Sequence, residues 1–215
     1  MKGAIVFDLD GTLIDSAPDI HAAVALTLGE EGRAPLSPET ILSFVGNGLP
    51  HLVGLVIGAA GLDPARHADL TARTLAHYNA VSGQRTVPYP GVAAALAALA
   101  AAGHALGICT NKPEAPARHI LAFLGLGPFD VVVGGDSLAA RKPDPAPLHA
   151  ALAALAPGPA IFVGDSEIDA ETAERAGVLF LLFTEGYRKA PVADLPHAAR
   201  FSDFAELPAL VRGLQ

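Results

Sequence analysis

Five apolar segments of strand length constrain the fold of this 215-residue chain more than any other feature. They occupy residues 3–7, 104–109, 130–134, 160–164 and 178–183. Their apolar residues are mostly continuous, which is typical of strands that are buried on both faces of a parallel sheet. Helical patterns at 91–102, 114–124, 145–155 and 167–176 alternate with the last four strands. The alternation predicts an α/β fold with a doubly wound parallel sheet.

The interval between the first and second strands is far longer than a single crossover helix requires. Three helix starts fall within it, each a capping residue with a proline in the first turn. They are Ser16 with Pro18, Ser37 with Pro38, and Asp63 with Pro64. A glycine-rich break at 46–48 separates two of these helices. We therefore expect a helical subdomain at 15–87, with hinges near Asp15 and Val87, inserted into an α/β core formed by 1–14 and 88–215.

Charge and hydropathy exclude several classes of binding partner. The net charge of −8 argues against an extended nucleic-acid surface. No apolar run approaches the roughly 20 residues that a membrane span needs, and the apolar segment at 4–7 is too short for a signal peptide. The single cysteine, Cys109, permits no intrachain disulfide, and we expect it to be a buried thiol. These features predict a cytoplasmic monomer or homodimer that binds neither nucleic acid nor membrane.

Charged, amide and hydroxyl side chains follow four of the predicted strands. They are Asp8 and Asp10 after the first, Thr110, Asn111 and Lys112 after the second, Arg141 and Lys142 after the third, and Asp165 and Asp169 at the fourth. Ligands of open α/β sheets bind at the carboxyl ends of the strands, so we expect these side chains to form one site. Repulsion among Asp8, Asp10 and Asp165 requires a cation, and their hard oxygen ligands suit Mg²⁺, which in turn favours a phosphate ligand.

These residues resemble the motifs of a known family. DLDGT at 8–12, CTN at 109–111, RKP at 141–143 and GDSEID at 164–169 are similar to the four motifs of the haloacid dehalogenase (HAD) superfamily of phosphotransferases. The helical insertion matches the position of that family's cap. The resemblance covers almost the whole chain and implies a Rossmann-like HAD core with a helical cap subdomain after the first strand.

The resemblance also implies roles for the acidic residues. Asp8 would attack phosphorus and form an aspartyl-phosphate. Asp10 would protonate the leaving alkoxide and then accept a proton from the attacking water. Asp8, Asp165 and the backbone carbonyl of Asp10 would bind Mg²⁺.

The remaining motif residues are implied to hold the phosphate. Thr110, Lys142 and backbone N–H groups near Asn111 would contact phosphoryl oxygens. Asp169 would orient Lys142 or a metal-bound water. Ser166 and Asp169 also form a helix-capping pattern, and both roles of Asp169 are compatible.

Further segments resemble bacterial phosphoglycolate phosphatases. They are DSAPD at 15–19, FVGNGLP at 44–50, YPGV at 89–92 and NKPEAPARHIL at 111–121. The implied substrate is 2-phosphoglycolate, which carries a carboxylate. The predicted cap contains no lysine, so backbone amides near Asn47 and Gly48 are candidates for binding this carboxylate. Lys112 or Arg141 from the core would supplement them, although Lys112 is equally well interpreted as a solvated charge at the rim.

Other functions stay open at this point. A β-phosphoglucomutase-like sugar phosphomutase shares both acids of DLDGT, and another small-metabolite HAD phosphatase would have the same motifs. A receiver domain, which is a phosphorylated switch rather than an enzyme, also uses acids, a threonine and a lysine at strand ends. Its phosphoacceptor would be Asp136, but the helical insertion and the GDSEID acids would then have no explanation.

Overall fold

A parallel sheet of six strands forms the centre of the computed structural model, which describes residues 3–155 and 157–214. The strands lie in the order β5-β4-β1-β6-β7-β8. They are β1 (Ala4–Phe7), β4 (Ala105–Cys109), β5 (Val131–Val133), β6 (Ala160–Gly164), β7 (Leu179–Phe183) and β8 (Ala199–Phe201). The doubly wound parallel sheet and its five predicted strands are confirmed, and β8 is an addition. Met1 and Gln215, the outer bounds predicted for the core, lie outside the described residues.

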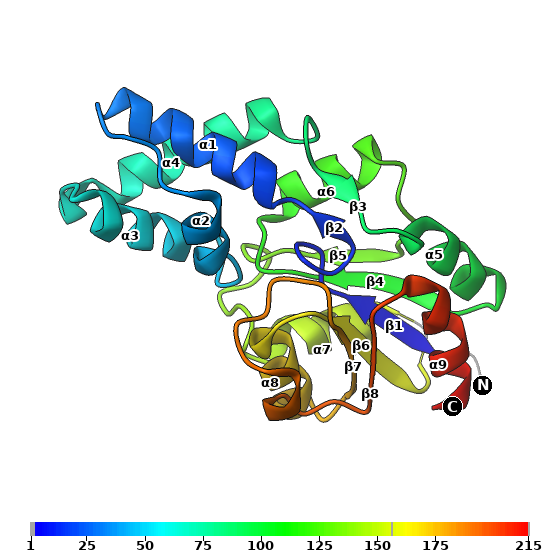
Figure 1. Ribbon diagram of the computed structural model, residues 1–215. Coiled ribbons are helices and arrows are strands. Elements are labelled where there is room, and N and C mark those ends of the chain that lie inside the picture. The colour runs from blue at the N-terminus through cyan, green and yellow to red at the C-terminus, as the bar shows by residue number, and fades with distance from the viewer. Residues whose placement is uncertain (1–2, 156, 215) are drawn as a thin grey trace.

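Helices cover both faces of this sheet (Figure 1). One layer contains α5 (Val92–Ala101), α6 (Glu114–Phe123) and α9 (Leu207–Gly213), and the other contains α7 (Ala146–Ala153) and α8 (Glu167–Ala176). Successive residues of a strand face opposite sides. Ile5 and Phe7 accordingly pack in the first layer, and Ala4 and Val6 in the second. Burial on both faces explains why the sequence of β1 is apolar without alternation.

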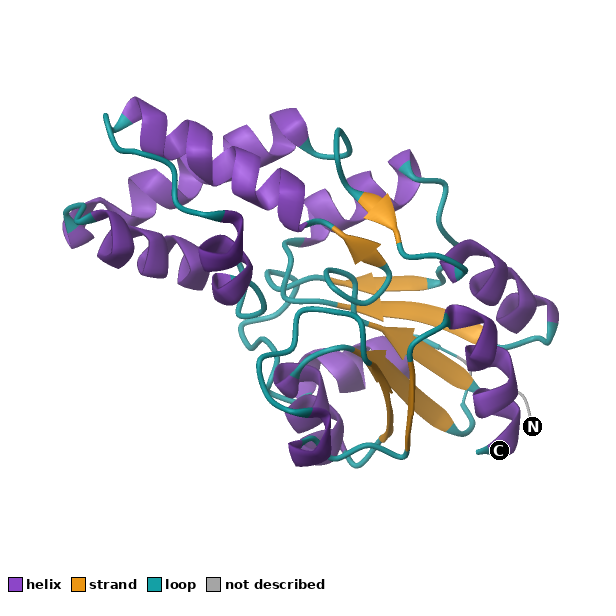
Figure 2. Cartoon of the chain, viewed as in Figure 1, coloured by secondary structure: helices purple, strands orange, loops and turns teal. Residues whose placement is uncertain are grey.

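Four of the helices between β1 and β4 form a separate group beside the sheet (Figure 2). They are α1 (Ala17–Glu30), α2 (Pro38–Phe44), α3 (Leu49–Ala60) and α4 (His67–Val81), with a short 3₁₀ turn, η1 (Pro64–Arg66), before α4. We call α1 to α4 the cap. These helices share an apolar cluster that includes Ile20, Ile41, Val53 and Leu70. The bounds 15–87 for the cap stay a prediction.

The chain enters and leaves the cap through two short antiparallel strands, β2 (Ile14–Asp15) and β3 (Val87–Pro88). Asp15 pairs with Val87 in this ribbon. Asp19 on α1 lies buried nearby and accepts hydrogen bonds from the backbone of Gly83, Arg85 and Thr86. The two connections are therefore tied to each other where the sequence predicts the hinges.

All three predicted helix starts are confirmed, because α1, α2 and η1 each begin directly after the predicted capping residue with a proline in the first turn. The Ser37 hydroxyl accepts a hydrogen bond from Thr40 N at the start of α2, and Asp63 caps η1 in the same way. Ser16 precedes α1, but its hydroxyl donates to Asp10 at 2.5 Å instead of capping the helix. The helix start at Ser16 is therefore correct, but its side chain makes no capping hydrogen bond, because the hydroxyl donates to the Asp10 carboxylate.

Other local predictions hold. The glycine-rich break separates α2 from α3, and α8 spans the predicted residues 167–176. Cys109 is buried. No helix among the described residues combines the length and apolar character needed to cross a membrane.

Candidate active site

The carboxyl ends of β1, β4 and β6 form one edge of the sheet, and the predicted motif residues meet there. Asp8 follows β1, the central strand from which the chain winds outward in both directions, and Thr110 and Asp165 follow its two neighbours. Carboxylate oxygens of Asp8, Asp165 and Asp169 all lie within 4.8 Å of one another. These three acids therefore lie close together at this edge of the sheet, as the sequence predicts.

Lys142 is the cation within this group of acids. Its side chain is 2% exposed, and its Nζ lies 2.9 Å from Asp8 Oδ1 and 2.6 Å from Asp169 Oδ1. Burial alone lowers the pKa of Lys142, but the Asp169 and Asp8 carboxylates raise it above its ordinary value. Lys142 therefore stays charged at neutral pH, and its one ammonium contacts two of the three clustered carboxylates.

The three clustered acids are buried, and together they carry more negative charge than Lys142 neutralises. Burial raises the pKa of Asp8 to about 6, although Lys142 opposes the shift. Burial, followed by the charges of Asp169 and Asp8, raises the pKa of Asp165. The ion pair with Lys142 lacks hydrogen-bond geometry, so Asp8 Oδ1 is buried without a hydrogen-bond partner among the described residues. Hard carboxylate oxygens with excess negative charge suit a divalent cation such as Mg²⁺.

Asp165 is held rigidly by its neighbours. Thr12 Oγ1 donates to Asp165 Oδ1 at 2.6 Å, and the backbone N–H of Tyr187 donates to Oδ2 at 2.6 Å. Gly11 has a φ of +87°, and a β-carbon there would lie 2.6 Å from Asp165 Oδ2. The Gly-Thr turn after Asp10 therefore does two things: it lets the backbone approach Asp165 and supplies a hydroxyl to it.

Asp169 makes both of the contacts that the sequence suggested. Its Oδ2 accepts hydrogen bonds from Ser166 N and Ser166 Oγ, and Ser166 Oγ accepts from Asp169 N, which completes a capping box at the start of α8. Its Oδ1 accepts from Lys142. The helix cap thus fixes the carboxylate that positions the lysine.

Asp10 lies apart from the three clustered acids and pairs with Lys112. Lys112 Nζ lies 2.9 and 3.1 Å from the two carboxylate oxygens of Asp10, and Ser16 donates to one of them. The Lys112 residue is only 8% exposed. Its interpretation as a solvated rim charge is wrong, because Asp10 draws it into the interior. Metal binding by Asp10 was expected through its backbone carbonyl and stays a prediction.

Thr110 and Asn111 begin the loop after β4, and both are buried. The Thr110 hydroxyl accepts a hydrogen bond from Lys112 N at 3.3 Å. The Asn111 side chain donates to the carbonyls of Gly46 in the cap and Lys142 in the core, each at 3.0 Å. Asn111 thus bridges the two regions, and phosphate binding by its backbone stays a prediction.

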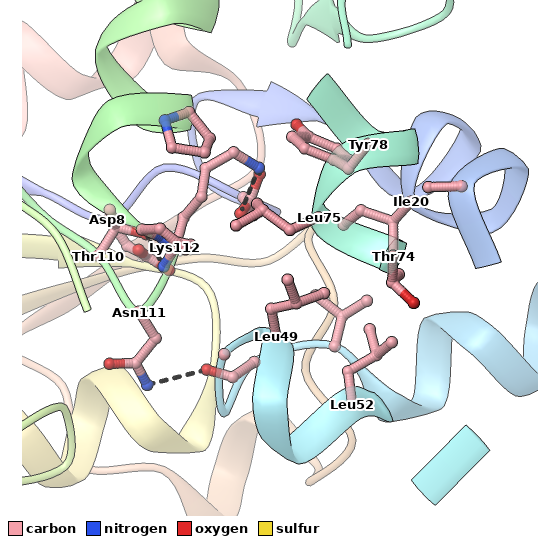
Figure 3. Close-up of a pocket in the computed structure, with 17 residues that line it drawn as sticks. Asp8, Ile20, Leu49, Leu52, Thr74, Leu75, Tyr78, Thr110, Asn111 and Lys112 are labelled. Carbon is pink, nitrogen blue, oxygen red and sulfur yellow. Dashed lines mark hydrogen bonds and ion pairs between the residues drawn. The ribbon is translucent and has the colours of Figure 1, made fainter. Parts of the chain in front are cut away.

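A pocket of about 70 Å³ lies between this edge and the cap (Figure 3). Asp8, Asp10, Thr110, Asn111 and Lys112 form its floor. The cap contributes mainly apolar side chains, among them Ile20, Val45, Leu49, Leu52 and Leu75. Gly46 and Gly48 also line it, whereas Asn47 is not among the lining residues.

Sequence reasoning missed Tyr187, which lies in the loop after β7. Its hydroxyl donates to Asp15 Oδ1 at 2.6 Å and accepts from Ser16 N at 2.8 Å and Ala17 N at 3.0 Å. Tyr187 therefore connects Asp165 to the start of α1. Its position after a fifth parallel strand was the available signal, since that loop emerges at the same edge of the sheet.

Comparisons with known proteins agree with this geometry. A family model described as haloacid dehalogenase-like hydrolase matches residues 5–183. A phosphoglycolate phosphatase of Cereibacter sphaeroides is 54% identical over 213 residues, covering 98% of each chain. That of Rhodobacter capsulatus is 48% identical over 220 residues, covering 99% of this chain and 98% of the relative. A crystal structure described as a predicted phosphoglycolate phosphatase from Haemophilus somnus has a TM-score of 0.89 at 30% identity and covers 97% of both chains.

Proposed function

Because the chain belongs to the haloacid dehalogenase-like hydrolase family, we propose that it hydrolyses 2-phosphoglycolate to glycolate and phosphate through an aspartyl-phosphate on Asp8. The HAD superfamily and the phosphatase class, a phosphoric monoester hydrolase, are confirmed. The receiver interpretation is wrong, and its candidate Asp136 is exposed and accepts a hydrogen bond from Glu114 N. The observation that carries the proposal is Asp8 at the base of the pocket, beside Lys142 and two further buried acids.

In the first step, an Asp8 carboxylate oxygen attacks phosphorus and the bond between phosphorus and the ester oxygen breaks. The protonated form of Asp10 gives its proton to the departing alkoxide, which leaves as glycolate. Thr110, Lys142 and the backbone N–H of Asn111 hold the phosphoryl oxygens during the transfer. The location of Lys142 against Asp8 supports this role, because its charge then lies beside the attacked group.

In the second step, water attacks the aspartyl-phosphate and Asp10 accepts its proton. The bond between phosphorus and the Asp8 oxygen breaks, so phosphate leaves and the carboxylate is regenerated. Ser16 and Lys112 hold the Asp10 side chain at the pocket floor, where it is available for both proton transfers.

Asp8, Asp165 and the Asp10 carbonyl would bind the divalent cation, which we propose is Mg²⁺. When bound, the cation supplies positive charge that offsets the repulsion between the acids and a phosphate dianion. Asp169 positions Lys142, since its Oδ1 contacts the ammonium and its Oδ2 is committed to the cap of α8.

The pocket supports a small substrate. Its volume of about 70 Å³ is only several times the roughly 10–15 Å³ that a single water requires. A sugar phosphate would bring several hydroxyl groups against a cap wall that is mostly apolar, where unpaired polar groups are unfavourable. The lining therefore favours 2-phosphoglycolate over the substrate of a sugar phosphomutase. The cytoplasmic location and the monomeric or dimeric state stay predictions.

The decisive experiment is a panel of phosphorylated metabolites assayed for phosphate release with Mg²⁺. We expect the highest kcat/KM for 2-phosphoglycolate, with equal amounts of glycolate and phosphate formed. A preference for glucose phosphates, or conversion of a sugar phosphate to its isomer, would contradict the proposal.

A further inference from the structure

We propose that Lys112 of the core and Tyr78 of the cap together bind the carboxylate of the substrate. This assignment rests on the proposed hydrolysis of 2-phosphoglycolate and names the residues that select it. It replaces the cap backbone at Asn47 and Gly48 as the main recognition element. Both side chains line the pocket that contains Asp8 (Figure 3).

Lys112 is the cationic side chain among the described residues that line this pocket. The cap arginines have other contacts: Arg66 and Arg73 form ion pairs with Glu30, Glu31 and Asp69, and Arg33 donates to Gly61 O. Arg85 and Arg141 are not among the lining residues, and Arg141 is exposed. A carboxylate that enters the pocket therefore meets the Lys112 ammonium.

Tyr78 supplies the matching group from the cap. The residue is 6% exposed, and its buried Oη has no hydrogen-bond acceptor in the part of the chain that is described. Thr74, one turn earlier on α4, also lines the pocket, but its hydroxyl already donates to Leu70 O at 2.7 Å. A buried hydroxyl without a partner is unfavourable, so the Tyr78 Oη is a donor that a ligand can satisfy.

The two groups are adjacent. Lys112 Nζ lies 4.3 Å from the centroid of the Tyr78 ring. Lys112 approaches both carboxylate oxygens of Asp10, and a lysine ammonium has three N–H donors. One donor can therefore contact a substrate carboxylate while the contact with Asp10 remains. Since Lys112 belongs to the core and Tyr78 to α4, the carboxylate would be bound only when the two regions are packed together.

The proposal predicts selectivity between two esters of equal carbon number, 2-phosphoglycolate and ethyl phosphate. Ethyl phosphate lacks the carboxylate, so the ratio of the two kcat/KM values isolates its recognition. We expect Tyr78→Phe to lower this ratio about tenfold and Lys112→Met about 100-fold, since each loses a hydrogen bond to a charged group. The KM for 2-phosphoglycolate should rise in Tyr78→Phe.

Matched controls lie outside the pocket. Tyr89→Phe removes a hydroxyl from a ring that packs against Phe183, and Arg175→Met removes the charge of an exposed arginine on α8. Both controls should keep the ratio of the unaltered protein. Circular dichroism would check folding, and Tyr78→Phe alone decides the outcome if Lys112→Met does not fold.

The outcomes distinguish the assignment of Lys112 and Tyr78 from the proposed hydrolysis of 2-phosphoglycolate. A fall in the ratio of more than threefold in Tyr78→Phe, with unchanged controls, supports the assignment. A smaller fall, in an unaltered protein that prefers 2-phosphoglycolate, overturns the assignment and leaves the proposed function standing. An unaltered protein that does not prefer 2-phosphoglycolate to ethyl phosphate overturns the proposed substrate, and the assignment with it.

Discussion

The floor and the wall of the pocket differ in chemistry and in origin. The floor consists of charged and polar side chains that follow β1 and β4, such as Asp10 and Lys112, which form an ion pair with each other. The wall consists of apolar side chains on the helices of the cap, with Tyr78 as its unpartnered hydroxyl among the described residues. The difference indicates that residues of the core carry out the phosphoryl transfer, whereas a small number of contacts with the cap select the substrate.

The largest expected effect comes from the floor. Asp8→Asn preserves the shape of the side chain but removes the nucleophile, so kcat should fall by about 10⁴-fold or more for any phosphate ester. Phosphate release with 2-phosphoglycolate and with ethyl phosphate would measure this loss. Folding is checked by circular dichroism, and an activity within tenfold of the unaltered protein would show that Asp8 is not the nucleophile.

The second effect tests whether the two buried lysines, Lys142 and Lys112, have different roles in the reaction. Lys142→Met removes the ammonium that contacts Asp8 and Asp169, so kcat/KM should fall about 10³-fold for both esters alike. Lys112→Met should lower both values through its contact with Asp10 and, unlike Lys142→Met, should also lower the ratio of 2-phosphoglycolate to ethyl phosphate. If both variants lost selectivity for 2-phosphoglycolate over ethyl phosphate to the same extent, the proposed difference between the two lysines would be wrong.

Lys142→Met also has an expected effect on stability. It leaves two buried carboxylates without their cation, which typically lowers the free energy of unfolding by about 3–5 kcal/mol. Urea unfolding without added metal would measure the change. Arg175→Met, at an exposed position on α8, is the control and should unfold near the midpoint of the unaltered protein.

The fold could be predicted where each element carries its own local signal. The strands β1, β4, β5, β6 and β7 are continuous apolar runs, and α8 is bounded by a capping box and by Gly177, whose φ is +66°. The last strand, β8, and the helix α9 carry much weaker signals. Their places depend on packing against β7 and α5, which no local pattern records.

The floor could be predicted because backbone geometry places residues that follow parallel strands at one edge. The positions of Asp8, Thr110 and Asp165 could be predicted from that rule and the sequence motifs alone. The burial of Lys112 and the position of Tyr78 depend on how the cap packs against the core. A β-carbon at Gly48 would lie 3.0 Å from Asn111 O, a tertiary approach that the sequence does not reveal.

The third effect concerns the metal. Mg²⁺ that binds only the folded state, at 100 times its Kd, should stabilise by about 2.7 kcal/mol and raise Tm by roughly 5–10 °C. Asp165→Asn should abolish most of this rise, because Asp165 is one of the three clustered acids. Asp136→Asn, an exposed acid outside that cluster, is the matched control. An equal rise in the Asp165 variant would remove Asp165 from the metal site.

The smallest effect is expected on the outer surface of the cap, where charges are plentiful but lie away from the pocket. Arg73 contacts Glu31 at 2.6 Å and Asp69 at 3.4 Å and also pairs with Glu30, and none of these residues lines the pocket. Exposed ion pairs are weak and are screened by salt, so Arg73→Met should change kcat/KM for either ester by less than about twofold. A tenfold loss confined to 2-phosphoglycolate would mean that a cap arginine reaches the carboxylate. The apolar wall would then not be the surface that selects the substrate, and the division between a charged floor and an apolar wall would fail.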